Sequence, residues 1–181
     1  MRIIAGKHRG RTLATFRGND IRPTADRVKE SLFQILSAKL VGARVLDLFC
    51  GSGALGLECL SRGAREAVFN DVSEESLAVL RKNLRALGES GTVTRSSYEV
   101  CLKNVSGSFG LIFCDPPYKA NCEEEIFLLV KERKLLSEGG LIVFESEREI
   151  VPSAGFVCTD ERRYGRTTVR LFAESRAEEE V

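Results

Sequence analysis

Four consecutive residues, Asp115-Pro116-Pro117-Tyr118, could hold a planar amine. They follow the apolar run 109–114, which predicts a buried strand. Two prolines fix φ and donate no hydrogen bond, so strand pairing should stop there. Asp115 and the Pro116 carbonyl could accept the two hydrogens of an exocyclic amine, and Tyr118 could stack on the attached ring. The pattern predicts a site for amino methylation at a strand end, where open α/β sheets bind ligands.

A glycine-rich turn lies earlier in the chain. Gly51, Gly53 and Gly56 have the G-x-G-x-x-G spacing, and Asp71 lies 20 residues after Gly51. Two ligand classes fit this frame. A nicotinamide dinucleotide places its pyrophosphate at the helix N-terminus, whereas S-adenosylmethionine carries an ammonium, a carboxylate and a sulfonium. Asp47, just before the turn, would repel a pyrophosphate and therefore favours S-adenosylmethionine.

Alternating strands and helices must position both sites. The periodicity predicts strands at 44–50, 66–71, 92–96, 111–114 and 141–145, and helices at 54–62, 74–87, 98–103 and 123–133. Residues 155–163 and 167–173 are typical of an antiparallel pair. A β-hairpin over 1–16 and a helix over 25–40 precede these elements. The order predicts an α/β fold with a mostly parallel, doubly wound sheet.

Length and composition fit one globular domain. We expect a single methyltransferase domain over 1–174, divided into a basic N-terminal hairpin and helix (1–40) and a Rossmann-like core (41–174), and then an acidic tail (175–181). No apolar run approaches the roughly 20 residues that span a bilayer, and the N-terminus has no apolar signal core. The six cysteines have no C-x-x-C spacing, which argues against zinc or other metal sites and disulfides. We expect a cytoplasmic protein.

Basic residues are concentrated in two parts of the chain. Residues 1–29 hold eight Lys or Arg and two Asp. A second cluster consists of Arg162, Arg163, Arg166 and Arg170. This distribution indicates an anionic partner, although a solvated basic face would give the same pattern.

Together the motifs resemble the class I, Rossmann-like amino-methyltransferases, and most closely the RsmD-type bacterial 16S ribosomal RNA guanine-N2 methyltransferases. The resemblance covers about residues 1–173. It is carried by residues 2–11, 22–28, 47–58, 109–118, 145–147 and 164–165.

The resemblance implies a seven-stranded methyltransferase sheet whose last strand is antiparallel. It also implies S-adenosylmethionine-dependent methylation of one guanine amine in 16S ribosomal RNA, with an assembled or assembling small subunit as the substrate. We expect a monomer. The implied catalytic residues are those of the Asp115–Tyr118 motif. Asp47, Gly51 and Gly53 would contact the methionine half and Asp71 the ribose, while Ser97 stands where many relatives place an Asp or Asn for the adenine amine. Phe49 and Ser52 complete the cofactor set, and the expected RNA contacts are Arg2, Lys7, Arg9, Arg11, Arg22 and Arg27.

Other functions stay open from the residues alone. Adenine-N6 and protein-glutamine methyltransferases use a similar corner, often with Asn in place of Asp115. Cytosine-C5 chemistry is less favoured, because it needs a nucleophilic Cys and Cys114 is expected to point into the core. A dinucleotide-dependent oxidoreductase and a non-catalytic RNA-binding assembly factor are alternatives of other classes.

Overall fold

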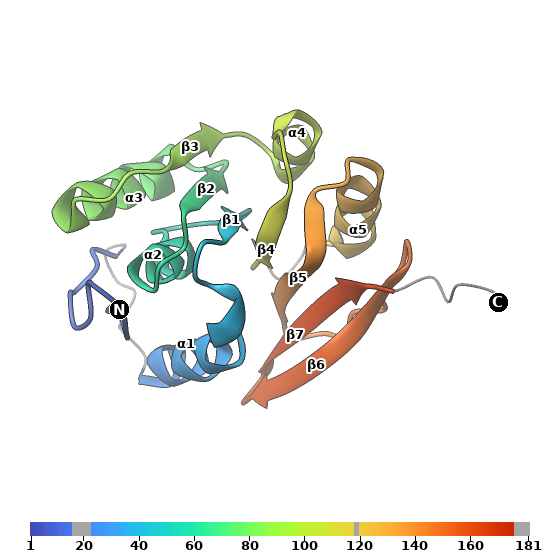
Figure 1. The fold of residues 1–181 in the computed structure, drawn as a ribbon, viewed down its shortest axis with the longest axis horizontal. Coiled ribbons are helices and arrows are strands. Elements are labelled where there is room, and N and C mark those ends of the chain that lie inside the picture. Colours follow the sequence, from blue (N-terminus) through green and yellow to red (C-terminus); the bar gives the residue numbers. More distant parts are fainter. Residues whose placement is uncertain (16–22, 118–119, 176–181) are drawn as a thin grey trace.

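The computed structural model describes residues 1–15, 23–117 and 120–175, without the side chains of 23–26. Within these residues, seven strands form one sheet in the order β3-β2-β1-β4-β5-β7-β6 (Figure 1). β7 is antiparallel to both of its neighbours, and every other pair is parallel. The predicted α/β fold and its antiparallel last strand are therefore confirmed. The strands are β1 (Arg44–Asp47), β2 (Glu66–Asp71), β3 (Thr92–Arg95), β4 (Phe109–Cys114), β5 (Leu136–Ser146), β6 (Phe156–Tyr164) and β7 (Thr167–Glu174).

The helices lie close to their predicted positions. α3 begins and ends as predicted, because Ser73 accepts a hydrogen bond from the Ser76 N–H (3.2 Å) and Gly88 adopts a φ of 67°. The predicted helix over 25–40 is instead divided into α1 and a 3-10 turn, in which the Lys39 N–H donates to the Leu36 carbonyl. The helical elements are α1 (Pro23–Ile35), η1 (Ser37–Lys39), α2 (Ala54–Ser61), α3 (Glu74–Leu87), α4 (Tyr98–Asn104) and α5 (Glu123–Glu132). Among them, no described helix is long and apolar enough to cross a membrane.

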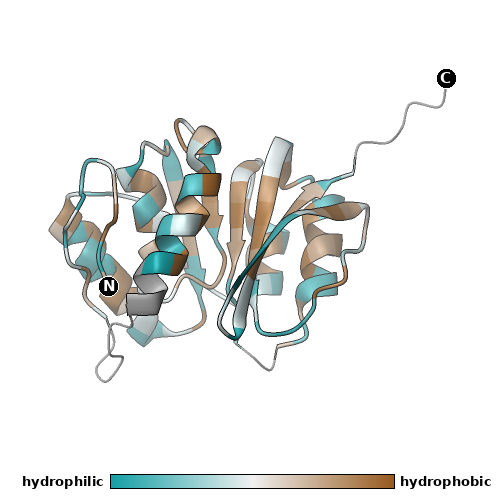
Figure 2. Cartoon of the chain, turned by 90° about the horizontal axis from the view of Figure 1, so that it is seen from below, coloured by the Kyte–Doolittle hydropathy of each residue, from teal (hydrophilic) through white to brown (hydrophobic). Residues whose placement is uncertain are grey.

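The sheet lies between two layers of helices. α4 and α5 pack on one face, where Leu46, Ile112 and Phe144 are buried. α1, α2 and α3 cover the other face, whose buried side chains include Val45 and Phe113. The central strands are accordingly the most apolar part of the molecule (Figure 2). Burial on both faces explains why these strands read as nearly continuous apolar runs.

The end of β1 and the start of β5 differ most from the predicted strand boundaries. β1 ends at Asp47 because the Leu48 N–H donates to Phe113 of β4, while the Cys50 N–H donates to Asn70 of β2. The chain thus crosses from one neighbour to the other and leaves the ladder. β5 begins at Leu136, before the expected start at 141, because a bulge at its N-terminal end accommodates Gly139.

The N-terminal segment folds back on itself as predicted. Arg2 and Thr12 form an antiparallel bridge, and the Leu13 N–H donates to the Met1 carbonyl (3.0 Å). Ile3 and Leu13 are buried in the cluster formed with α2 and α3. The hairpin is therefore part of the hydrophobic core. Residue 16 of the predicted hairpin and tail residues 176–181 lie outside the described residues.

Candidate active site

The chemistry-bearing residues meet at the carboxyl edge of the sheet. Asp47 ends β1, Asp71 ends β2 and Asp115 follows β4. β1 lies between β2 and β4, and this is the point where the strand order reverses. Such a switch point leaves a crevice in which doubly wound folds bind ligands. The two motifs predicted from the sequence are thus brought side by side.

The glycine turn has the backbone conformation that its sequence requires. Gly51 and Gly53 have φ values of 52° and 83°, a region that other residues rarely adopt. Gly56 has a different reason, because a Cβ there would lie 2.3 Å from the Phe69 ring. The three glycines therefore form the turn and let α2 approach β2 closely.

Asp47 is a buried carboxylate directly under this turn. Its side chain is 3% exposed, and one oxygen accepts a hydrogen bond from the Gly56 N–H (3.0 Å). Burial raises the pKa of Asp47 to about 7; the Gly56 N–H opposes this and the Asp71 carboxylate adds to it. A cationic ligand beside Asp47 would offset the cost of burying the charge. The pocket therefore suits an ammonium better than a pyrophosphate.

Asp71 fixes the turn from the neighbouring strand. Its two oxygens accept the N–H groups of Gly51 (2.9 Å) and Ser73 (2.8 Å). A carboxylate has about four lone-pair positions, so it can also accept hydrogen bonds from ribose hydroxyls.

The start of α4 also borders the crevice. Ser97 caps this helix by accepting the Val100 N–H (3.5 Å). The Phe49 ring lies 5.8 Å from the Tyr98 ring and forms an aromatic wall beside it. Asn70, which the sequence did not single out, is 2% exposed and donates to the Leu48 and Ser96 carbonyls (both 3.1 Å). It fixes the ends of three strands together.

Asp115 projects from the end of β4 into this crevice. It keeps a solvent-exposed face, while Cys114 before it is 1% exposed and packs in the core, as predicted. Desolvation by the surrounding protein raises the pKa of Asp115 to about 8, and the carboxylates of Glu145 and Asp47 act in the same direction. The Pro117 carbonyl accepts the Ala120 N–H (2.8 Å) and turns the chain. Tyr118 lies outside the described residues.

A cavity of about 240 Å³ opens beside Pro116 and Pro117. Its far wall is held by Arg148, whose guanidinium donates to the Ala120 carbonyl and to Asn121 and forms an ion pair with Glu123 (2.6 Å). Arg148 thus ties the loop after the Asp115 motif to the end of β5. The sequence analysis did not identify this residue. Ala120, Glu123, Glu145, Ser146, Glu147 and Arg148 complete the lining.

The predicted RNA contacts have different surroundings. Lys7 pairs with Glu89 (2.7 Å) and Arg11 donates to the Ala86 carbonyl (2.7 Å), so both attach the hairpin to the end of α3. Arg2, Arg9 and Arg27 line a groove of about 400 Å³ between the hairpin and α1. Arg22 lies outside the described residues.

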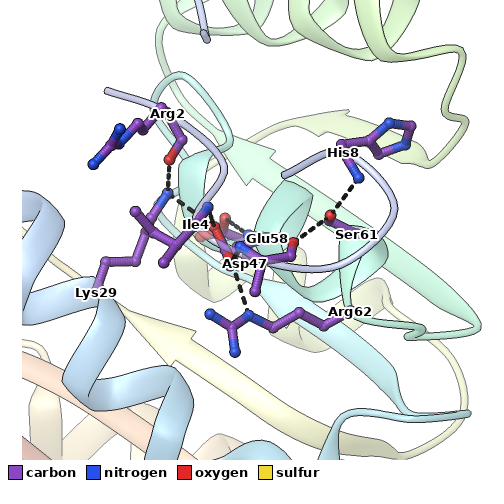
Figure 3. A network of polar contacts seen from close by, with 10 residues as sticks. Arg2, Ile4, His8, Lys29, Asp47, Glu58, Ser61 and Arg62 are labelled. Atoms are coloured by element: carbon purple, nitrogen blue, oxygen red, sulfur yellow. Dashed lines mark hydrogen bonds and ion pairs between the residues drawn. The ribbon is translucent and has the colours of Figure 1, made fainter. Parts of the chain in front are cut away.

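The hairpin is attached to the core through Glu58, another residue without a predicted role (Figure 3). Glu58 is fully buried and accepts the N–H groups of Ile4 (2.8 Å) and Ala5 (3.0 Å). It also pairs with Lys29 (3.1 Å) and Arg62 (2.8 Å). Burial by itself would raise the pKa of Glu58, but these partners lower it below its usual range.

The residues of the second basic cluster differ in their exposure and their contacts. Arg170 is 7% exposed, pairs with Glu161 (2.6 Å) and donates to the Arg148 carbonyl (2.8 Å), so it is structural. Arg163 and Arg166 are exposed at the turn between β6 and β7. Because β7 is antiparallel, this turn lies at the carboxyl edge, and Arg166 approaches Glu147 of the cavity wall (3.8 Å).

Known proteins share this architecture along most of the chain. A family model described as "Conserved hypothetical protein 95" matches residues 1–173. "Putative rRNA methyltransferase YlbH" of Bacillus subtilis is 38% identical over 181 residues, covering 95% of this chain and 98% of the relative. "Ribosomal RNA small subunit methyltransferase D" of Escherichia coli K12 is 37% identical over 177 residues, with 95% and 89% covered. The solved structure of "Putative methyltransferase yhhF from Escherichia coli" superposes with a TM-score of 0.87 at 36% identity, covering 97% of this chain and 99% of that one.

The fold and the site define a methyltransferase of the Rossmann-like class. Within that class, the chain belongs to the Conserved hypothetical protein 95 family, the family of RsmD-type methyltransferases. The resemblance inferred from the motifs is thereby confirmed, and the oxidoreductase alternative for the glycine turn is wrong.

Proposed function

We propose that the protein methylates the exocyclic N2 amine of one guanine in 16S ribosomal RNA, using S-adenosylmethionine. The observation that carries the proposal is the position of Asp115, at a strand end between the Asp47 pocket and the cavity beside Pro116. The names of its relatives support ribosomal RNA of the small subunit as the substrate class.

The residues of the crevice fit the cofactor. Asp47 would neutralise its ammonium, the turn from Gly51 to Gly53 would pass beneath its methionine half, and Asp71 would bind its ribose hydroxyls. Phe49, Ser52 and Ser97 would complete the pocket, with Ser97 and Phe49 toward the adenine. When bound there, S-adenosylmethionine supplies an electrophilic methyl group on a sulfonium.

The chain itself would orient the amine. A guanine amine is a weak nucleophile because its lone pair is delocalised into the ring. Among the described residues, no donor hydrogen-bonds to the Asp115 carboxylate or to the Pro116 carbonyl, so both can accept the amine hydrogens. Such contacts direct the lone pair toward the methyl donor, and the catalytic gain comes from positioning. Once nitrogen has gained the methyl group it is cationic, and Asp115 would accept the proton that it loses. Pro116 and Pro117 would keep this corner rigid, and Tyr118 would stack on the base.

Basic groups would bind the RNA around the pocket. Arg2, Arg9 and Arg27 line the groove beside the hairpin, and Arg22 is a further residue that we expect to contact the RNA. Lys7 and Arg11 would contribute through the attachment of the hairpin to α3. Phosphate contacts of this kind give affinity and register, while the base pocket gives identity. We further propose that the enzyme acts as a cytoplasmic monomer on assembled or assembling small subunits.

Methyl transfer from labelled cofactor tests the proposal. Small subunits from cells lacking the endogenous activity should acquire label in one guanosine, identified by nucleoside mass spectrometry as N2-methylguanosine. Asp115→Ala should abolish transfer while calorimetry shows cofactor binding unchanged. Label in adenosine or in protein would refute the substrate assignment. An Asp115→Ala protein that retains its biological activity would instead indicate a non-catalytic assembly factor.

A further inference from the structure

A second carboxylate stands beside Asp115. Cys114 of β4 pairs with Phe144 of β5 in parallel register, so the next residues, Asp115 and Glu145, are neighbours across the strands. Adjacent strands lie about 4.8 Å apart. Cys114 and Phe144 both pack on the face covered by α4 and α5. Because side chains alternate along a strand, Asp115 and Glu145 point away from that face, toward the side of Asp47.

Glu145 has no protein partner among the described residues. No hydrogen bond or ion pair there reaches its carboxylate, although the residue is partly buried and borders the cavity beside Pro116. The other acidic wall residues differ, because Glu123 pairs with Arg148 (2.6 Å) and Glu147 approaches Arg166 (3.8 Å). A partly desolvated acceptor without a donor is costly unless a ligand supplies one. In the proposed function the substrate base enters the cavity beside Pro116, and Glu145 borders that cavity.

The two carboxylates together suit only one type of base edge. In guanine the N2 amine has N1–H on one side and the N3 lone pair on the other, so its Watson–Crick side presents two adjacent donors. In adenine and cytosine the Watson–Crick neighbour of the amine is a ring nitrogen with a lone pair (N1 of adenine, N3 of cytosine), which a carboxylate would repel. A carboxylate next to the amine acceptor thus favours guanine and opposes the other two bases.

We propose that Glu145 is a specificity-determining residue, whose carboxylate accepts the N1–H of the target guanine while Asp115 accepts from its N2 amine. This inference rests on the proposed function and gives a structural reason for guanine as the substrate. It also explains why neither carboxylate has a donor among residues 1–15, 23–117 and 120–175. Burial raises the pKa of both groups, and the Glu145 carboxylate adds to the rise at Asp115; two donors from one base would offset the cost of holding both carboxylates ionised.

The test replaces the N1–H donor of the base by an acceptor and the Glu145 acceptor of the protein by a donor. Once the methylated nucleotide is mapped, small-subunit RNA is prepared with guanine or with 2-aminopurine at that position. 2-Aminopurine keeps the 2-amino group but has a lone pair at N1. Glu145→Gln presents an amide N–H₂ that can donate to that lone pair, and Glu147→Gln is the matched control on the same wall. The ratio of kcat/KM values for the two RNAs is compared within each preparation, so the fraction of active protein cancels.

Wild-type protein should prefer guanine by about 10- to 100-fold, the effect of leaving one polar partner unsatisfied. Glu145→Gln should lower this ratio at least about 10-fold, and Glu147→Gln should leave it unchanged. The fluorescence of 2-aminopurine gives a second readout without methyl transfer: the Glu145→Gln protein should bind that RNA more tightly than wild type does.

The outcomes separate this inference from the proposed function. If wild type methylates guanine and both variants have the same guanine-to-2-aminopurine ratio of kcat/KM as wild type, the role of Glu145 is refuted while the proposed function stands. If wild type methylates adenine, or transfers nothing to ribosomal RNA, both are refuted. A lowered ratio confined to Glu145→Gln supports both.

Discussion

Replacing Glu58 by Gln tests whether the N-terminal hairpin is held by a buried charge. Glu58 is 0% exposed, and Lys29, its ion-pair partner, is 4% exposed. Gln keeps one oxygen for the Ile4 and Ala5 N–H groups, but its amide N–H₂ then faces the N–H donors of Lys29 or Arg62. Removing one member of a buried ion pair typically costs about 3–5 kcal/mol. That is a large part of the roughly 5–15 kcal/mol that stabilises a domain.

The free energy of unfolding should be measured by urea denaturation with linear extrapolation. Glu74→Gln is a matched control, because its partner Arg81 is 41% exposed and such pairs contribute about 0–1 kcal/mol. The double variant Glu58→Gln/Lys29→Met, compared with Glu58→Gln and Lys29→Met alone, gives the coupling energy between the two charges. The double variant should lose less stability than the two single variants lose in sum. A loss for Glu58→Gln of less than about 1 kcal/mol, equal to the control, would refute the anchoring role.

The same variant makes a prediction about pH. The pKa of Glu58 is lower in the folded protein than in the unfolded chain. The stability that its charge contributes is therefore present above the unfolded pKa of about 4.3 and is lost as pH falls through the folded value. The difference between wild type and Glu58→Gln should shrink in acid. A constant difference from pH 7 to pH 3 would contradict it.

Three further predictions concern the site. Arg148→Ala should lower kcat/KM about 10- to 100-fold with unchanged cofactor affinity, because the cavity wall loosens and the base is misplaced. The kcat/KM of wild type should rise as pH passes through about 8, because desolvation and Glu145 raise the pKa of Asp115 to about 8 and only its ionised carboxylate can accept the proton of the methylated amine. The variant Arg163→Ala/Arg166→Ala should weaken RNA binding. The slope of log affinity against log salt concentration should become shallower by the amount expected for the loss of up to about two phosphate contacts.

The two predictions that use variants each have a control. Arg133 is exposed at the end of α5, on the opposite edge of the sheet, so Arg133→Ala should match wild type in kcat/KM. Lys103→Ala/Arg133→Ala removes two charges from that edge and should leave the salt dependence unchanged. A kcat/KM that is flat between pH 6 and pH 9, or equal effects of variant and control, would contradict the corresponding prediction.

Local signals were enough to predict most elements and both motifs. Strand β2 and helix α3 occupy the predicted residues, because alternation, capping by Ser73 and termination at Gly88 are properties of adjacent residues. The strand end after Cys114 follows from two prolines alone. β1 and β5 were predicted less well, because their ends depend on hydrogen bonds to other strands and on a bulge.

The sequence by itself therefore determined the fold class, the two motifs and their location at strand ends. Only the tertiary structure decided which charged groups meet. Glu58 and Ile4 lie 54 residues apart, and the sequence gives no sign that the carboxylate in an apolar helix will satisfy a hairpin backbone. Asp115 and Glu145 become neighbours through the register between β4 and β5, and Arg148 closes the cavity from the end of β5. Such contacts are fixed by packing between distant segments, where burial makes each unpaired charge costly, and no local pattern encodes them.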